Sequence, residues 1–226
     1  TVKILKSPEV VKAALIGFPS IEDAGNCVAQ IIAEGCIPAG MEIMDKALTK
    51  ATNDYSKAGY PTDAEAMMIV EFDGTEHEVE AYIKKAKKIA EENNSSSLKV
   101  SKSNTERLKF WAGRKAAFPA CGVLAPDYMC MDGSIPRGKL AEVLNEITRL
   151  SKKYDLPVAN AFHAGDGNLH PLIMFDANNK ESLRKCEEFG ADILKYCVKV
   201  GGALTGEHGV GIEKRELMCE AFNNND

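Results

Sequence analysis

Residues 157–175 read PVANAFHAGDGNLHPLIMF, two apolar runs separated by an Asp-Gly pair. Such a pair between two runs of strand-forming residues is among the strongest sequence signals for a tight hairpin turn. We take Asp166-Gly167 as the turn, with strands at 157–164 and 169–175. In that register His163 lies directly opposite His170, and both imidazoles project from the same face of the sheet.

The two histidines are candidate metal ligands. Their Cβ atoms would be about 5 Å apart, and neutral imidazole nitrogens bind borderline divalent cations. Glu207 is the candidate third ligand, because Thr205–Gly211 (TGEHGVG) is a glycine-rich loop that can bring side chains close to a sheet. Two histidines and one carboxylate leave coordination positions for a substrate. His208, which points away from Glu207 in an extended backbone, is the candidate general base.

The same residues allow simpler interpretations. A cross-strand histidine pair can be a partly exposed, hydrogen-bonded ladder with no ion, and from the residues alone we give this the same weight as a metal site. Gly209 and Gly211 can simply mark a turn, and Asp166 is assigned to the turn rather than to a ligand set. Asn168 shares the face of the two histidines and is a candidate substrate-binding residue.

Strands and helices alternate along the rest of the chain. Apolar residues at helical spacing, preceded by capping residues, predict helices, and short β-rich apolar runs predict strands. The predicted helices are 21–34, 75–90, 103–119, 137–150 and 180–200; the predicted strands are 1–5, 40–45, 66–72, 98–100, 128–135, 157–164 and 169–175; residues 46–61 are a polar loop. This pattern, with a tight hairpin, predicts an α+β fold: a mainly antiparallel sheet with helices packed on one side, in ferredoxin-like repeats.

Composition sets the class of protein. The 226 residues are 45% hydrophobic and 27% charged with a net charge of -5, which is typical of a globular protein and gives no sign of nucleic-acid binding. The seven cysteines are scattered and contain no CxxC pair, which indicates reduced thiols in a cytoplasmic setting. The chain begins without Met and without a leader, so we expect it to be part of a longer protein.

Several catalytic and nucleotide-binding motifs are missing. The glycines near residue 209 do not form GxGxxG between a strand and a helix, and the sequence contains no P-loop. GxSxG and HExxH are also absent, which disfavours an α/β-hydrolase or a zinc protease of that type. The chain alone is therefore not expected to bind a dinucleotide.

Three motifs make the sequence resemble a known family. They are His163–Pro171, Gly206–Gly211 and Asp127–Pro136. Together they resemble the C-terminal domain of FAD-linked oxidases of the glycolate oxidase, D-lactate dehydrogenase and D-2-hydroxyglutarate dehydrogenase type, over essentially the whole chain. Trp111–Phe118 and Pro126–Pro136 are most similar to the FAD-binding subunit of the glycolate oxidase type.

The resemblance implies a two-domain flavoenzyme that oxidises a 2-hydroxy acid by hydride transfer from C2 to FAD. An N-terminal domain, absent here, would hold most of the FAD, and residues 1–226 would form one domain that covers the flavin and supplies the substrate pocket. The resemblance also implies that His163, His170 and Glu207 bind a divalent metal, zinc or manganese. His208 would be the general base, and Arg114 would hold the substrate carboxylate.

One departure from the family bears on the substrate. Cys130 or Met129 stands where the hydroxyglutarate branch has a lysine, which favours a small acid such as glycolate or D-lactate. We expect the chain alone to be inactive and its partners to be the 2-hydroxy acid, the FAD domain of the same protein, and iron-sulfur and other oxidase subunits. The expected location is the cytoplasm, with membrane attachment through partner subunits left open. The alternatives are a non-redox metal- or ligand-binding module and a purely structural interaction domain.

Overall fold

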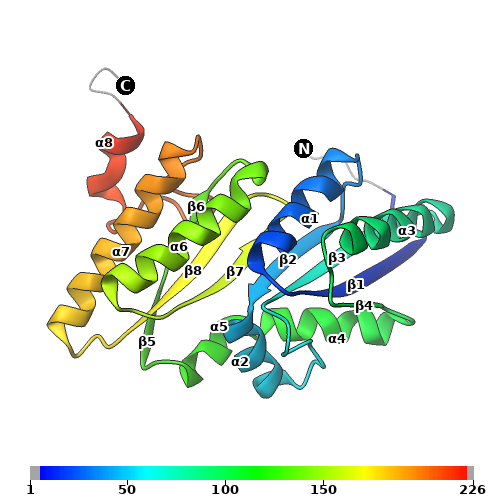
Figure 1. Ribbon diagram of the computed structural model, residues 1–226, viewed down its shortest axis with the longest axis horizontal. Coiled ribbons are helices and arrows are strands. Elements are labelled where there is room, and N and C mark those ends of the chain that lie inside the picture. The colour runs from blue at the N-terminus through cyan, green and yellow to red at the C-terminus, as the bar shows by residue number, and fades with distance from the viewer. Residues whose placement is uncertain (1–5, 223–226) are drawn as a thin grey trace.

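The computed structural model describes residues 6–222, so the strand expected at residues 1–5 lies outside the described residues. The described residues form one 8-stranded sheet in the order β4-β1-β3-β2-β7-β8-β5, with β6 paired to β8 (Figure 1). The strands are β1 (Val10–Phe18), β2 (Gly40–Asp45), β3 (Ala66–Gly74), β4 (Ser97–Val100), β5 (Asp127–Cys130), β6 (Gly133–Ser134), β7 (Val158–His163) and β8 (Asn168–Phe175). The helices are α1 (Ile21–Ala33), α2 (Lys46–Ser56), α3 (Glu76–Glu92), α4 (Asn104–Lys115), α5 (Ala117–Ala120), α6 (Leu140–Tyr154), α7 (Lys180–Lys199) and α8 (Met218–Ala221).

Two halves with the same plan build the sheet, and every strand pair is antiparallel. In the first half, β1-α1-β2 and β3-α3-β4 follow one another and give the order β4-β1-β3-β2 of a ferredoxin-like unit. The second half repeats this plan with β5, α6, β7, β8 and α7. Among the described residues of this half, a single bridge between Ser134 and Ala203 stands in place of a fourth strand. The α+β prediction of ferredoxin-like repeats in an antiparallel sheet is therefore confirmed.

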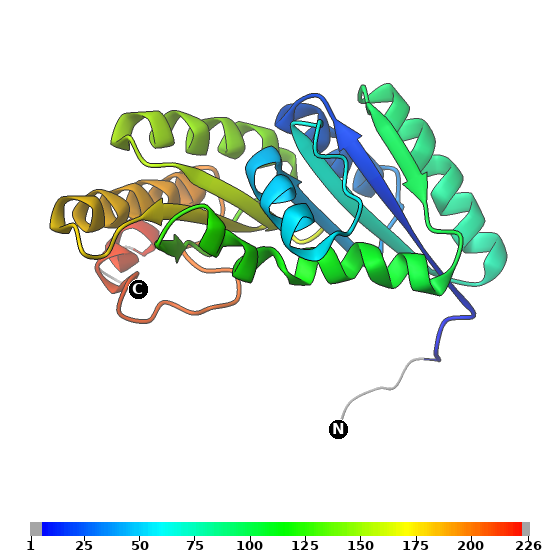
Figure 2. The same ribbon diagram turned by 90° about the horizontal axis from the view of Figure 1, so that it is seen from below.

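Helices lie against both faces of the sheet. The four longest, α1, α3, α6 and α7, cover one face as predicted, whereas α2, α4 and α5 lie against the opposite face (Figures 1 and 2). This second layer corrects the expectation of helices on one side only. Strand β3 gives the reason. Ala66–Val70 is a continuous apolar run, so apolar side chains project from both faces of the strand, and each face must be buried by a layer of helices.

The segment predicted as a polar loop forms α2. The Asp45 carboxylate caps this helix by accepting a hydrogen bond of 2.9 Å from the backbone N–H of Leu48. Its buried face is Leu48, Thr49, Ala51 and Thr52, which contains a single large apolar residue. Hydrophobic periodicity is therefore weak there, although the helix packs on the sheet. The strand β1 (Val10–Phe18) was also missing from the predicted elements.

Two other predicted elements are each divided in the structure. The strand expected at 128–135 is interrupted by Met131 and Asp132 between β5 and β6. The helix expected at 103–119 ends with α4, and α5 follows after Ala116, because Pro119 has no N–H to continue the first helix. The helices predicted at 21–34 and 180–200 each end within one residue of the prediction.

The hairpin register differs from the predicted one by two residues. His163 pairs with Asn168, and His170 pairs with Ala161. The turn therefore contains four residues, 164–167, and the carbonyl of His163 accepts hydrogen bonds from the backbone N–H groups of Asp166 and Gly167 at 3.0 and 3.1 Å. Because side chains alternate with a period of two, a shift of two leaves both histidines on the same face of the sheet.

Gly167 offers a test of this turn. Its φ is +74°, and a Cβ at this position would lie 2.2 Å from the backbone oxygen of Ile135. We expect Gly167→Ala to lower the free energy of unfolding by about 2 kcal/mol, measured by urea denaturation. Gly122→Ala is the control, because a Cβ there meets nothing within 4 Å. Equal stability of the two variants would contradict this description of the turn.

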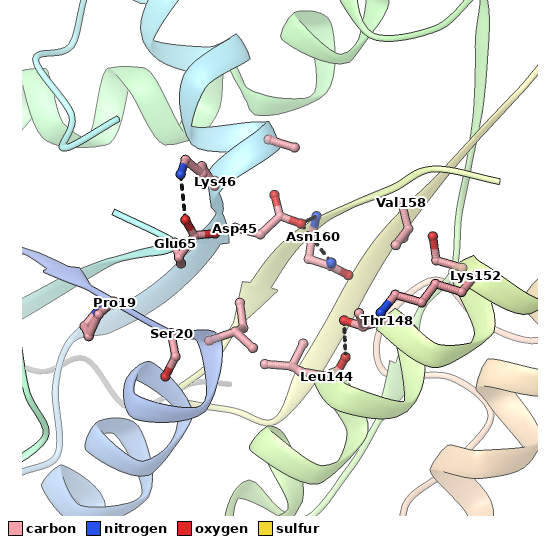
Figure 3. Close-up of a pocket in the computed structure, with 13 residues that line it drawn as sticks. Pro19, Ser20, Asp45, Lys46, Glu65, Leu144, Thr148, Lys152, Val158 and Asn160 are labelled. Carbon is pink, nitrogen blue, oxygen red and sulfur yellow. Dashed lines mark hydrogen bonds and ion pairs between the residues drawn. The ribbon is translucent and has the colours of Figure 1, made fainter. Parts of the chain in front are cut away.

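A cavity of about 500 Å³ lies where the two halves meet, between α1, α2 and α6 (Figure 3). Inside it, Asp45 accepts hydrogen bonds from the backbone N–H and the side-chain amide of Asn160 at 2.7 and 2.8 Å. These bonds tie the end of β2 to β7. Burial raises the pKa of the Asp45 carboxyl to about 6, although the hydrogen bonds from Leu48 and Asn160 oppose this rise.

Candidate metal and substrate site

Two histidines form the centre of the site. His163 is the last residue of β7 and His170 lies in β8, and their ring centroids are 5.0 Å apart with an interplanar angle of 87°. His170 is only 1% exposed. Burial lowers its pKa, and the neighbouring His163 lowers it further against the opposing effect of the Glu207 carboxylate, so the surroundings favour the neutral ring. A neutral imidazole is the form that binds metal ions.

The third side chain of the site, Glu207, comes from the segment after α7. Its Oε1 lies 3.0 Å from Nε2 of His170 and 3.6 Å from Nε2 of His163. Each of the three side chains offers one ligand atom, and these atoms lie within 4.8 Å of one another. Nitrogen or oxygen ligands of one tetrahedral zinc ion are about 3.3 Å apart. The structure thus brings together the three residues predicted as a ligand set, close enough that one ion could contact all of them, and we call them the Glu207 set.

Glu42 contacts His163 and was not predicted as a site residue. It is the cross-strand partner of His163, and its Oε1 lies 2.7 Å from Nδ1 of that ring. A carboxylate can only accept, so Nδ1 carries the proton, and Nε2, on the side of Glu207, is the ring nitrogen that could bind an ion. This hydrogen bond raises the pKa of His163, against the opposing effect of burial. A carboxylate in the middle of the apolar strand 40–45 was the signal that sequence reasoning missed.

Arg114 reaches the same carboxylate from α4. Its Nε and Nη2 lie 3.1 and 3.0 Å from Oε2 of Glu42, and its side chain is buried. Nη2 is close enough for an ion pair but has no aligned hydrogen-bond acceptor among the described residues. Helix α4 is fixed on the sheet by Glu71, which accepts hydrogen bonds from Trp111 Nε1 at 2.5 Å and Arg107 Nη1 at 2.8 Å.

His208 and Asn168 also line the site. The ring of His208 stacks on His170 with centroids 5.1 Å apart, and its Nε2 lies 3.7 Å from Oε1 of Glu207. The expectation that His208 points away from Glu207 is wrong, because the backbone is not extended there. Asn168 is directly opposite His163, as its shared face requires, and its Oδ1 is buried without a hydrogen bond among residues 6–222. A Cβ on Gly206 would lie 2.3 Å from that oxygen, so glycine lets the loop approach Asn168.

Asp132 shapes the loop that carries Glu207 and His208. Its fully buried carboxylate accepts the backbone N–H groups of 206, 207 and 208 at 3.0 Å each and the Thr205 hydroxyl at 2.7 Å. The buried ammonium of Lys214 lies 2.9 Å away. Burial alone would raise the pKa of Asp132, but the hydrogen bonds from Thr205, Lys214 and the loop N–H groups outweigh it and hold the pKa well below its usual range. Asp132 lies in the motif Asp127–Pro136, but the sequence pattern did not predict this structural role.

The comparison with protein families decides the affiliation. Residues 7–226 match the family model of FAD linked oxidases, C-terminal domain. The chain belongs to this family. Figure 2 shows the two parts of this FAD-linked oxidase domain that carry Arg114 and Glu207: α4, drawn green, and the segment after α7, drawn orange to red, which lie on the same side of the molecule.

Curated relatives of this FAD-linked oxidase domain are about twice as long as the chain. It is 49% identical to the glycolate oxidase subunit GlcD of Escherichia coli K12 over 226 residues, which is 100% of the chain and 45% of that protein. It is 34% identical to GlcD of Bacillus subtilis, over 96% of the chain and 46% of that protein. A probable mitochondrial D-lactate dehydrogenase of Danio rerio is 27% identical over 97% of the chain and 44% of that protein.

Solved structures share the fold of this domain at low sequence identity. The 4-ethylphenol oxidase of Gulosibacter chungangensis has a TM-score of 0.64 and 11% identity, over 88% of the chain and 46% of that protein. A p-cresol methylhydroxylase has a TM-score of 0.62 and 13% identity, over 87% of the chain and 45% of that protein. All seven cysteines of the domain are free thiols. Within residues 6–222, no helix has the length and apolar character needed to cross a membrane.

Proposed function

We propose that the chain is the substrate- and metal-binding part of an FAD-dependent enzyme that oxidises a small 2-hydroxy acid, such as glycolate or D-lactate. The family and the relatives named glycolate oxidase subunits and D-lactate dehydrogenases support the reaction class. The observation that carries the proposal is the Glu207 set, in which three ligand atoms from two strands and a distant loop lie within 4.8 Å of one another.

The residues of the Glu207 set fit a divalent ion, zinc or manganese. Two imidazole nitrogens and a carboxylate oxygen suit such ions, and the carboxylate of Glu42 fixes the tautomer of His163 that ligation needs. When bound, the ion supplies polarisation of the substrate hydroxyl, and FAD, held mainly by an N-terminal domain of the same protein, supplies the hydride acceptor.

Three further residues complete the proposed mechanism. His208 accepts the hydroxyl proton at a ring nitrogen, since its ring stacks on His170 and is exposed to an incoming substrate. Arg114 holds the substrate carboxylate through Nη2, the guanidinium nitrogen without an aligned acceptor among the described residues. Asn168, whose Oδ1 is likewise without a donor in residues 6–222, orients the substrate.

Cys130 supports a small substrate. It pairs with Leu172 in the sheet, so its side chain is on the same face as His170, whereas the preceding Met129 is on the other face. Cys130, and not Met129, is therefore the residue at the expected lysine position that faces the site. A thiol there gives no cation for the second carboxylate of a long diacid.

The remaining proposals concern the cellular setting. The relatives named as subunits of glycolate oxidase support a protein that assembles with other oxidase subunits, iron-sulfur subunits among them. The free thiols are consistent with a cytoplasmic location.

Arg114→Lys tests the proposed function in a protein of the relatives' length. We expect at least a tenfold rise in KM for the acid, because the single ammonium of lysine cannot contact Glu42 and the substrate carboxylate with the fixed geometry of a guanidinium. The measurement is reduction of an electron-accepting dye over a panel of short 2-hydroxy acids, with the exposed Arg149→Lys as the control. The 226-residue chain alone is expected to give no turnover. Turnover by that chain without a flavoprotein domain would refute the proposal.

A further inference from the structure

A second group of metal-binding side chains lies on the other edge of the His170 ring. Cys130 from β5, His170 from β8 and His208 from the loop after α7 each offer one ligand atom within 4.8 Å of the others. We call these three residues the thiol set. Nδ1 of His170 lies 3.8 Å from the sulfur of Cys130, whereas Nε2 faces Glu207. The two ring nitrogens of one histidine thus face two different sets of ligands.

The thiol set has the spacing and chemistry of a site for a soft ion. Sulfur and nitrogen ligands on one tetrahedral zinc ion are about 3.5 Å apart, close to the distance between Cys130 and His170. Sulfur ligands select soft and borderline ions over hard ones. Cys130 is half-buried and His170 is buried, but His208 is exposed, so an ion can enter from the side of His208.

We propose that the thiol set binds a soft divalent ion of the cadmium or zinc class, at a position separate from the Glu207 set. As the metal–sulfur bond forms, the thiol releases its proton to the solvent. A neutral imidazole has one free lone pair, so His170 can serve only one of the two sets at a time. An ion in the thiol set also occupies His208, the proposed proton acceptor. That inhibitory consequence rests on the proposed function, whereas binding of the ion does not.

Cadmium is the probe, because a cadmium–thiolate bond gives an ultraviolet charge-transfer absorption that nitrogen and oxygen ligands do not give. Cys219 is exposed, so every protein in the test carries Cys219→Ser; the other cysteines apart from Cys130 are buried. We expect this parent chain to bind one equivalent of Cd²⁺ with that absorption. The added change Cys130→Ser should remove the absorption and weaken Cd²⁺ binding at least tenfold, and His208→Ala should also weaken binding.

His163→Ala and Glu207→Gln are the matched controls, because each removes a ligand from the Glu207 set alone. Both are expected to keep the absorption, and far-ultraviolet circular dichroism checks that each variant is folded. An absorption that survives Cys130→Ser, that never forms in the parent, or that disappears equally in His163→Ala overturns the proposal. If Mn²⁺ does not bind while the cadmium absorption depends on Cys130, the proposed function loses its metal and the thiol set stands.

Discussion

Asp132→Asn is expected to lower the free energy of unfolding by about 3 to 5 kcal/mol, the range for removing one partner of a buried ion pair. The ammonium of Lys214, with a side chain 4% exposed, would be left without its counter-ion. The new amide group would also face backbone N–H donors with an N–H group of its own. Urea denaturation followed by the fluorescence of Trp111, the single tryptophan, measures the loss.

The pH dependence of this loss has a definite sign. The pKa of Asp132 is lowered in the folded protein, so the stability that this residue contributes is fully present above its ordinary pKa of about 3.9. That contribution is lost as the pH falls below this value, and the asparagine variant should lack it at every pH. The difference in stability between the two proteins should therefore shrink in acid. A difference that grows as the pH falls would contradict the assignment.

Asp192→Asn is the matched control for Asp132→Asn. Asp192 forms an ion pair of 2.7 Å with Lys153, but both side chains are partly exposed, at 32% and 48%. Solvent screens such a pair, so we expect a loss below about 1 kcal/mol. The double variant Asp132→Asn with Lys214→Met should lose less free energy of unfolding than the two single variants lose in sum, since each substitution removes the same interaction. Additive losses would show that the two buried charges do not depend on each other.

Loss of a Glu207-set ligand is the second large expected effect. We expect His170→Ala and Glu207→Gln each to weaken Mn²⁺ binding by more than about 100-fold, because each removes one of three protein ligands. Glu42→Gln keeps the ligands but removes the carboxylate behind His163, so a loss of about 10 to 100-fold is expected. Equilibrium dialysis with elemental analysis measures all three.

The fourth histidine supplies the control for these ligand changes. His77 is exposed in α3, on the opposite face of the sheet from the site, so His77→Ala should bind Mn²⁺ with unchanged affinity. The Glu207 set would be refuted as a metal site by unchanged metal binding in Glu207→Gln together with His163→Ala. It would equally be refuted if all histidine variants, His77→Ala included, lost the metal to the same extent.

The sequence was a good guide to the fold wherever apolar periodicity was strong. The stripes of α1, α6 and α7 and the run of β3 predicted their elements to within a few residues. It failed at α2, whose buried face uses Thr49 and Thr52. It also failed on the second helical layer, because periodicity shows that a face is apolar but not which element covers it.

The candidate site was predicted in part. The shared face of His163 and His170 was correct although the register was not, since an error of two residues preserves the face. The positions of Glu42 and Asp132 could not be derived, because the partners of a buried carboxylate come from strands and loops distant in sequence. A carboxylate inside an apolar strand is nevertheless a usable signal, since such a group is rarely buried without partners.

The junction of the two halves is short, with three residue pairs between β2 and β7. The Glu207 set belongs wholly to the second half, whereas Glu42 and Arg114 belong to the first. Helices α1 and α6 pack on each other across this joint, and one apolar core runs through both halves. The placement of one half against the other therefore sets both the hydrogen bond that orients His163 and the distance from the Arg114 guanidinium to that ring, so a substitution at the joint would disturb these contacts without touching any of the three residues.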